Sequence, residues 1–198
     1  MTEQEDRQLI RELVENWVLW RDSRMWKKFR TLWHDDGIMM ATWSQGTADE
    51  FIARSQTAFD NGVRILHELG GTTVELCADR AIAQTRMTIH QRAAVHGVVC
   101  DVACIGRFYD FLEKRRGRWG LVLRQPIYEK DRLDPLDPGA SLTLDPERLK
   151  RYPEGYRHLA YLQEQAGFTP KTEMPGLVGP ELERLYSRGE RWLKGEPL

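Results

Sequence analysis

The sequence predicts an α+β fold, with helices near the N-terminus followed by a long antiparallel meander of strands. Apolar residues recur at helical intervals as far as Asn61-Gly62, and from Val63 onward they alternate with other residues as in strands. Short turn signals separate the alternating segments. The chain has 198 residues, of which 41% are hydrophobic and 30% charged, so it is long enough for one sizeable core and an appendage.

The first helix is predicted by its start signal and by an apolar stripe. Thr2 and Glu5 have the spacing of a capping box, in which each side chain binds the backbone N–H of the other residue. We therefore expect an amphipathic helix that begins here and buries one face. That face is formed by Ile10, Leu13, Val14, Trp17 and Val18.

Two shorter helices and one strand are expected before the alternating region. Residues 25–33 carry an apolar stripe and precede the helix-ending stretch 34–37 (His-Asp-Asp-Gly), so we expect a helix over 25–33. The polar residues of 34–37 would cap and solvate its end. A strand over 38–43 and a helix over 48–59 follow, and Asn61-Gly62 stops that helix.

Strands fill the rest of the regular region. Ala78-Asp79-Arg80 and Arg116-Gly117 have the composition of tight turns between them. The expected strands cover 63–69, 72–77, 81–92, 98–114 and 118–129.

A change in composition marks a C-terminal extension. Apart from Pro126, every proline lies at Pro135 or later, and we place the boundary near Asp131. This divides the chain into a body, 1–131, and an extension, 132–198. The extension should contain helical pieces near 154–165 and 180–193. Its apolar stripe must be covered, so we expect it to wrap across the body or across a partner subunit in a homodimer or homotrimer.

Charge and cysteine content exclude several classes of function. The net charge is −1, so no global field would draw the protein onto nucleic acid or a membrane surface. The N-terminus has charged residues where a secretory signal needs an apolar stretch, and the 3 cysteines do not form an even disulfide framework. We expect a cytoplasmic protein with reduced thiols and a small-molecule partner.

Absent motifs narrow the chemistry further. The sequence has no phosphate loop, no G-x-G-x-x-G, no G-x-S-x-G and no paired C-x-x-C. His67-Glu68 is not followed by the second histidine of a zinc-protease helix, and Cys100 with Cys104 has no evident further ligand. We therefore expect no cofactor and no metal.

Two polar residues fall on faces that should be apolar. Asp22 lies four residues after Val18 on the buried stripe of the first helix, and His67 shares its strand face with apolar neighbours. A buried carboxylate needs a partner, and a contact with His67 would make a general-base dyad. The alternatives are that His67 is a satisfied core histidine and that Asp22 caps a helix or pairs with Arg21 or Arg24.

Several stretches together resemble a known family. They are residues 10–13 (Ile-Arg-Glu-Leu), 20–22 (Trp-Arg-Asp), 32–37 (Leu-Trp-His-Asp-Asp-Gly), His67 before 74–76 (Val-Glu-Leu), 106–110 (Gly-Arg-Phe-Tyr-Asp) and 117–119 (Gly-Arg-Trp). Residues 5–131 resemble the SnoaL-like branch of the nuclear transport factor 2-like superfamily. That branch includes scytalone dehydratase, bile acid 7α-dehydratase and hexachlorocyclohexane dehydrochlorinase.

The resemblance implies a fold and a site. The fold would be a cone, in which helices pack in the concave face of a curved antiparallel sheet and leave one deep pocket. Asp22 and His67 match the catalytic dyad of the lyases in this group. Arg124 matches a pocket arginine that would orient the substrate or stabilise developing negative charge. Trp17 stands where related dehydratases often carry a tyrosine that assists the leaving oxygen.

Strand alternation predicts the other pocket residues. Thr85, Met87 and Ile89 share one face of their strand, as do Val102, Cys104, Gly106 and Phe108 on the next strand. Each of these is more often plain core than site. The full set of expected pocket residues is Trp17, Met39, Trp43, Met87, Ile89, Cys104, Phe108, and Tyr109 and Tyr128 as donors to a substrate oxygen.

These observations favour a cofactor-independent lyase. In it His67, held by Asp22, would abstract a proton, and water or another small group would leave an apolar, aromatic or polycyclic substrate. The alternatives are an isomerase of the ketosteroid type, an aryl-propanoid formaldehyde lyase, and a non-catalytic ligand-binding or dimerisation module. An Asp22–His67 contact that faces an open cavity would favour the lyase, and a sealed His67 would favour the binding module.

Overall fold

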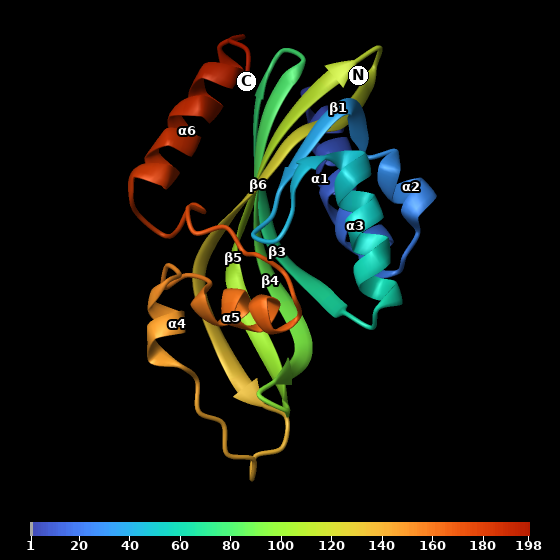
Figure 1. Cartoon of the computed structure of the whole chain (residues 1–198). Helices are drawn as coiled ribbons and strands as arrows, with labels where there is room; N and C mark the ends of the chain where they lie inside the picture. The colour runs from blue at the N-terminus through green and yellow to red at the C-terminus, as the bar shows by residue number, and fades with distance from the viewer. Residues whose placement is uncertain (1) are drawn as a thin grey trace.

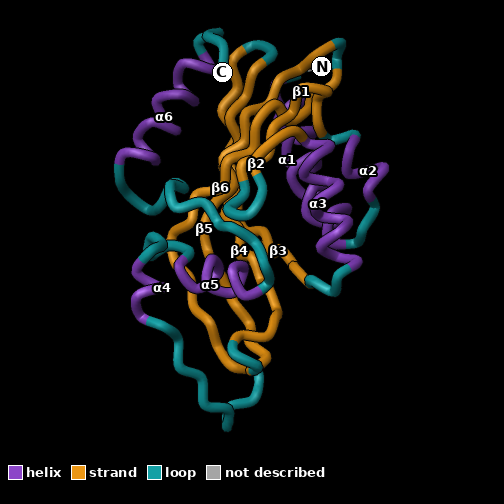
Figure 2. The backbone as a smooth tube through the Cα atoms, viewed as in Figure 1, coloured by secondary structure: helices purple, strands orange, loops and turns teal. Residues whose placement is uncertain are grey.

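The computed structural model describes residues 2–198, which form one six-stranded sheet with helices on both of its faces (Figures 1 and 2). The predicted α+β class is confirmed. In chain order the elements are α1 (Glu3–Asp22), α2 (Trp26–Arg30), β1 (Trp33–Met40), β2 (Gln45–Thr47), α3 (Ala48–Asp60), β3 (Arg64–Cys77), β4 (Arg80–Val95), β5 (Val98–Arg115), β6 (Arg118–Pro135), α4 (Pro146–Lys150), α5 (Arg157–Gln165) and α6 (Pro180–Leu193).

Capping boxes start the two longer N-terminal helices. Thr2 Oγ1 accepts the backbone N–H of Glu5 at α1, and Glu5 accepts the backbone N–H of Thr2, as the sequence predicts. Thr47 and Glu50 form the same arrangement at α3. The apolar stripe of α1 is buried, which fixes the rotation of this helix on the sheet and therefore the direction of its last residue.

The expected helix over 25–33 is too long, because its last residues belong to a strand. Helix α2 ends at Arg30, and β1 begins at Trp33. Trp33 is opposite Leu121 in a parallel pairing of β1 with β6, and its side chain is buried. In a longer helix, the backbone N–H and C=O groups of these residues would bond within the helix. In the structure, pairing with β6 satisfies them instead.

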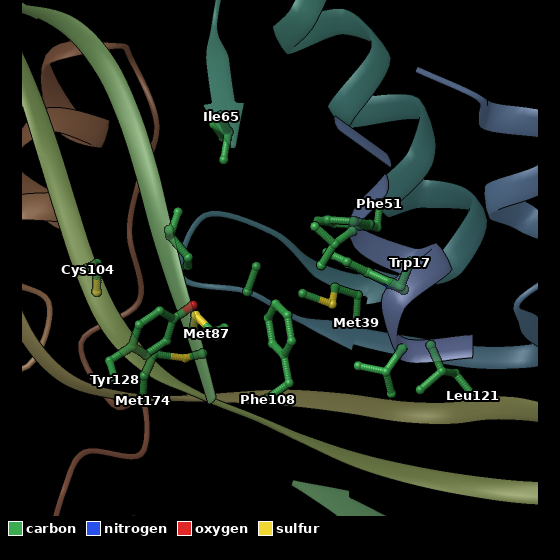
Figure 3. Close-up of a cluster of buried hydrophobic side chains, with 14 of the residues drawn as sticks. Trp17, Met39, Phe51, Ile65, Met87, Cys104, Phe108, Leu121, Tyr128 and Met174 are labelled. Atoms are coloured by element: carbon green, nitrogen blue, oxygen red, sulfur yellow. The ribbon is translucent and has the colours of Figure 1, made fainter. Parts of the chain in front are cut away.

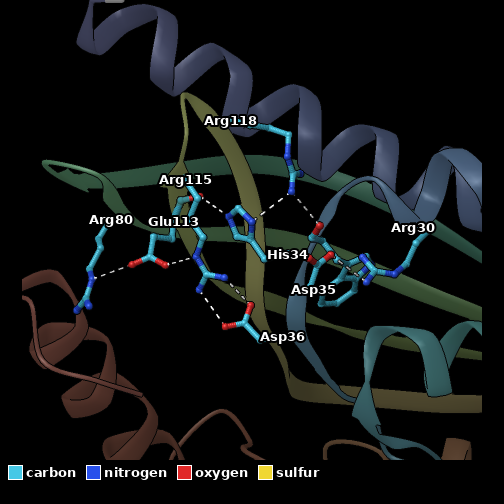
Figure 4. A network of polar contacts seen from close by, with 9 residues as sticks. Arg30, His34, Asp35, Asp36, Arg80, Glu113, Arg115 and Arg118 are labelled. Carbon is cyan, nitrogen blue, oxygen red and sulfur yellow. Dashed lines mark hydrogen bonds and ion pairs between the residues drawn. The ribbon is translucent and has the colours of Figure 1, made fainter.

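The stretch 34–37 is also part of β1 and does not cap a helix (Figure 4). The His34 ring is buried, with Nε2 2.8 Å from the backbone oxygen of Glu113 and Nδ1 3.2 Å from the Arg118 guanidinium. Asp36 accepts two hydrogen bonds from Arg115, at 2.6 and 3.0 Å. These polar contacts attach β1 to the β5–β6 hairpin.

The strand order is β2-β1-β6-β5-β4-β3. Strands β3 to β6 form the expected antiparallel meander, whereas β1 runs parallel to β6, so the sheet is not wholly antiparallel. The two strands expected over 63–77 are one strand, β3, with a register shift between Leu69 and Thr72 at Gly70-Gly71. An irregularity of this kind bends a strand, which suits a curved sheet.

Neighbouring residues of β5 face opposite sides of the sheet. Phe108 points to the concave face, which carries α1, α3 and α5, whereas Tyr109 points to the convex face beneath α6. The Tyr109 ring packs 5.4 Å from Tyr186 of α6, and a Cβ at Gly189 would overlap its hydroxyl. The expectation that Tyr109 lines the pocket is therefore wrong.

The C-terminal extension covers both faces of the sheet. Strand β6 continues to Pro135, past the boundary expected at Asp131, and α5 then lies on the concave face while α6 lies on the convex face (Figure 1, orange and red). The segment after α5 adds backbone bonds from Lys171 to Thr42 and from Tyr128 to Pro175, each of 2.8 Å. Among residues 2–198, no helix is both long and apolar enough to cross a bilayer.

Candidate active site

The last residue of α1 contacts the edge strand β3 through its side chain. The Asp22 carboxylate lies 3.0 and 3.2 Å from Nδ1 of His67 and accepts the backbone N–H of the same residue at 2.7 Å. The Trp17 ring stands edge-on to the imidazole, with ring centres 5.5 Å apart. These contacts fix both the position and the plane of the His67 ring.

Asp22 also determines which ring nitrogen of His67 is free. An ionised carboxylate only accepts hydrogen bonds, so Nδ1 of the neutral ring carries the proton and Nε2 is left as an acceptor. Arg21 donates from Nη1 to the same carboxylate at 3.0 Å. One carboxylate therefore receives hydrogen bonds from His67 and from Arg21.

The surroundings keep Asp22 charged and His67 neutral. Burial raises the pKa of the Asp22 carboxyl, but His67 and Arg21 outweigh it, and the pKa lies below its usual value. Burial is also the largest influence on His67, where it lowers the pKa; Asp22 opposes this, and the charges of Arg21 and Arg124 add to the lowering. His67 is thus an unprotonated base near neutral pH.

His67 lines two spaces of different size. The larger is an open cleft of about 720 Å³, which Asp22 also lines. The lining surface of this open cleft is mostly apolar and includes Val18, Leu19 and Leu66. Charged or polar side chains of Arg64, Glu68, His90, Arg92 and Asp101 also line it. The wall residues belong to β3, β4 and β5 and to the end of α1.

The smaller space that His67 lines is an inner cavity of about 30 Å³. Of the expected pocket residues, those that line it are Trp17, Met39, Trp43, Ile89, Phe108 and Tyr128. Met87 and Cys104 are buried in the same core but do not line the cavity (Figure 3). The extension contributes Leu159 and Gln163 of α5 to the lining.

The deep apolar pocket that the resemblance implies is mostly filled. The Trp17 ring packs against Phe29 and Phe108, with ring centres 5.2 and 5.3 Å apart, and Phe51 lies beside it (Figure 3). Leu159 and Gln163 of α5 also line the cavity. The packed rings and these α5 side chains leave space for only about one water-sized group.

Arg124 does not reach either space. Its guanidinium forms two hydrogen bonds of 2.7 Å with Asp110 and lies 4.3 and 4.0 Å from the ring centres of Trp17 and Phe108. Both partners of this ion pair are fully buried. Arg124 is therefore behind the rings that line the cavity, and Asp110 balances its charge.

Arg21 is the cationic residue that lines the inner cavity. From the sequence, Arg21 is expected only as a partner for Asp22. Helical spacing could have found it, because Arg21 lies four residues after Trp17 on the same face of α1. Gln91 was also missed; it lines both spaces and is buried on β4.

Within residues 2–198, no group of three or more His, Cys, Asp or Glu side chains is placed to hold a metal ion. Cys104 is buried, and burial raises the pKa of its thiol well above the usual value. Among the groups at this site that can take part in chemistry are the acceptor nitrogen of His67, the Asp22 carboxylate and the Arg21 guanidinium.

Comparison of the sequence with known proteins identifies a family. The model of the SnoaL-like domain matches residues 2–125. A PEP2-like protein of Fusarium vanettenii is 39% identical over 204 residues, which cover 98% of this chain and 88% of that protein. Pea pathogenicity protein 2 of the same species is 38% identical over the same shares. These alignments include the extension as well as the body.

Comparison of the structure with solved structures gives the same type of fold. A hexachlorocyclohexane dehydrochlorinase, LinA type 2, has a TM-score of 0.58 and 14% identity over 72% of this chain and 95% of that chain. A protein of Novosphingobium aromaticivorans assigned as a scytalone dehydratase has a TM-score of 0.56 and 13% identity over 70% of this chain and 97% of that chain. At these identities the likeness concerns the fold alone.

Proposed function

The chain belongs to the SnoaL-like family of the nuclear transport factor 2-like superfamily, and we propose that it is a lyase. In this proposal His67 removes a proton from a carbon acid, and water or another small group leaves. The observation that carries the proposal is the Asp22–His67 contact at the wall of the open cleft. Structural neighbours that include a dehydrochlorinase give it further support.

Each member of the pair has its own role in the proposed reaction. Asp22 accepts from Nδ1 of His67 and stabilises the imidazolium that forms when Nε2 takes the proton. The lowered pKa of His67 keeps the ring unprotonated before the reaction. A second hydrogen bond, from the His67 backbone to Asp22, holds the carboxylate in place during proton transfer.

One observation favours a second candidate function, a non-catalytic ligand-binding module. The inner cavity measures about 30 Å³, far less than a drug-sized ligand needs, so an apolar ring would enter only if the side chains around it moved. A protein of this kind would bind ligands in the open cleft without turnover. An isomerase or a formaldehyde lyase would use the same base and differs from our proposal in its product.

The experiment compares substrates and products directly. The protein is incubated with a panel of β-hydroxy and β-halo carbonyl compounds and aromatic alcohols, and mass spectrometry follows loss of water or halide. We expect Asp22→Asn to reduce turnover at least about a hundredfold, because the amide no longer holds the base. Asp101→Asn is the matched control, since Asp101 lines the same cleft and pairs with Arg92 instead.

The outcomes separate the candidates. Wild-type turnover in Asp22→Asn would contradict the dyad mechanism. Binding of panel compounds with no conversion of any of them would support the binding module over the lyase. A product with the mass of its substrate would indicate an isomerase, and release of formaldehyde would indicate the formaldehyde lyase.

A further inference from the structure

Three buried polar groups around the inner cavity have no hydrogen-bond partner among residues 2–198. They are the Nε–H of Arg21, the indole N–H of Trp17 and the side-chain oxygen of Gln91. Each residue is at most 2% exposed. An unpaired buried polar group typically costs about 1–3 kcal/mol, so two N–H donors at one small space indicate a guest that accepts hydrogen bonds. The Gln91 oxygen is itself an acceptor, so such a guest does not satisfy it.

The charge at this position comes from Arg21. Asp22 occupies Nη1 of the guanidinium, and Nε remains unpaired on the same side chain. The rings of Phe51 and Phe59, 5.8 and 5.5 Å from the guanidinium carbon, hold it in place. Arg124 also has a buried nitrogen without a partner, Nη1, while Asp110 binds its other two nitrogens. Arg124 does not line the cavity, so it cannot bind a guest there.

The size of the cavity limits what part of a substrate can enter. About 30 Å³ holds one oxygen atom with little else, whereas the open cleft of about 720 Å³ can hold the rest of a small molecule. His67 lines both spaces. An oxygen bound in the cavity therefore places the neighbouring carbon atoms beside the His67 ring.

We infer that the inner cavity is an oxyanion subsite in which Arg21 and Trp17 bind the carbonyl or carboxylate oxygen of a β-hydroxy or β-halo carbonyl substrate. The inference rests on the proposed function and names its substrate class. It adds to the apolar substrate expected from the sequence a small polar head group that reacts. The body of the substrate lies in the open cleft, whose lining includes Val18, Leu19 and Leu66.

The reaction that this arrangement supports is an elimination through an enolate. Nε2 of His67 takes the proton from the carbon next to the carbonyl, and the C–H electron pair moves onto the carbonyl oxygen in the subsite. The pair then returns to form the carbon–carbon double bond as the β carbon–oxygen bond breaks. The imidazolium returns its proton to the departing oxygen, so the products are an unsaturated carbonyl compound and water.

The first test is ligand binding by nuclear magnetic resonance with hexanoate and hexan-1-ol, which differ in the charged head group. Hexanoate should shift the resonances of the Arg21 Nε–H and the Trp17 indole N–H and leave the indole signals of Trp119 and Trp192 in place. It should also bind at least about tenfold more tightly than hexan-1-ol. Equal affinities, or shifts only at surface arginines, would overturn the inference.

The second test uses variants. Arg21→Gln should abolish the preference for hexanoate, whereas Arg24→Gln, an exposed arginine on the loop after α1, should keep it. Arg21→Lys retains a cation without the Nε–H and should retain only part of the preference, which serves if Arg21→Gln does not fold. Full preference in a folded Arg21→Gln or Arg21→Lys would overturn the inference.

These binding tests do not require turnover, so they separate this inference from the proposed lyase function. If hexanoate binds at Arg21 and Asp22→Asn retains wild-type turnover, the subsite stands and the dyad mechanism fails. If Asp22→Asn loses turnover and hexanoate shows no preference at Arg21, the dyad stands and the subsite fails.

Discussion

Two aspartate–histidine pairs in this chain share one hydrogen-bond pattern. In the first, Asp22 accepts from Nδ1 and from the backbone N–H of His67, at 3.0 and 2.7 Å. In the second, Asp131 accepts from Nδ1 and from the backbone N–H of His158, at 2.8 and 2.7 Å. The geometry of the two pairs is so similar that geometry alone does not distinguish a base from a structural contact.

The surroundings of the two pairs differ. The Asp131 carboxylate also accepts the backbone N–H of Leu159, so it satisfies N–H groups in the first turn of α5. The N-cap residue of α5, Tyr156, makes no side-chain capping bond. Asp22 instead binds Arg21 and lines the open cleft, and its partner His67 lines both the cleft and the inner cavity. An aspartate beside a histidine indicates chemistry only where a cavity and a second charge accompany it.

The largest expected effect distinguishes the two histidines by activity. We expect His67→Gln to lower turnover of any compound converted by the wild-type protein at least about a hundredfold, because glutamine cannot act as the base. His158→Gln is the matched control and should retain turnover, since His158 belongs to the cap of α5. Steady-state kinetics of both variants would measure this. A comparable loss in both would remove the distinction between the pairs.

A second prediction concerns stability. Asp131→Ala should lower the free energy of unfolding by about 2 kcal/mol, because two backbone N–H groups of α5 and the His158 ring lose a fully buried acceptor. The control is Asp134→Ala on the same strand, whose pairing with Arg132 is exposed and should be worth less than about 1 kcal/mol. Urea denaturation measures both. Equal effects would mean that the extension is not held through Asp131.

The parts of the site that the sequence predicts depend on local periodicity. The capping box fixes where α1 begins, and steps of four residues then place Asp22 at the end of its buried stripe. The alternation of side chains along β3 turns His67 toward Asp22. Such patterns repeat over two to four residues, so the sequence alone reveals them.

The parts that the sequence does not predict depend on distant contacts. Phe108 and Tyr109 are adjacent on one strand, so alternation alone excludes one of them from the pocket. The packing of Tyr109 beneath α6 shows that Tyr109 is the residue outside. Trp33 lies in a strand because β6 accepts it as a parallel neighbour. The volume of the cavity depends on how the ring of Trp17 packs. The position of the Arg124 guanidinium, outside the cavity, depends on its pairing with Asp110.

The third prediction is the pH dependence of the first pair. The pKa of His67 lies below its ordinary value of 6.5, mainly because the ring is buried. As the pH drops below 6.5, His67 takes up a proton in the unfolded chain but not yet in the folded chain. The free energy of unfolding therefore falls as the pH drops from 6.5 to the lower pKa of His67 in the folded chain. Turnover should persist below pH 6.5 and decline only at more acidic pH.

Two measurements test this pH dependence. The ring resonances of His67 should titrate below pH 6.5. Denaturation of the wild-type protein and of His67→Gln should show the extra loss of stability in acid only in the wild-type protein. Titration of His67 above pH 6.5 would contradict the prediction, because the ring would then be protonated when the reaction needs a base.

The smallest expected effect concerns the second histidine. The His158 side chain is 27% exposed, and its ring makes one hydrogen bond, to Asp131. His158→Gln removes this bond but leaves the backbone bonds from residues 158 and 159 to the carboxylate, so it should lower the free energy of unfolding by at most about 1 kcal/mol. Urea denaturation of His158→Gln and of Asp131→Ala measures the difference between the two variants. If His158→Gln is as destabilising as Asp131→Ala, then the ring, and not the cap of α5, holds the extension on the sheet.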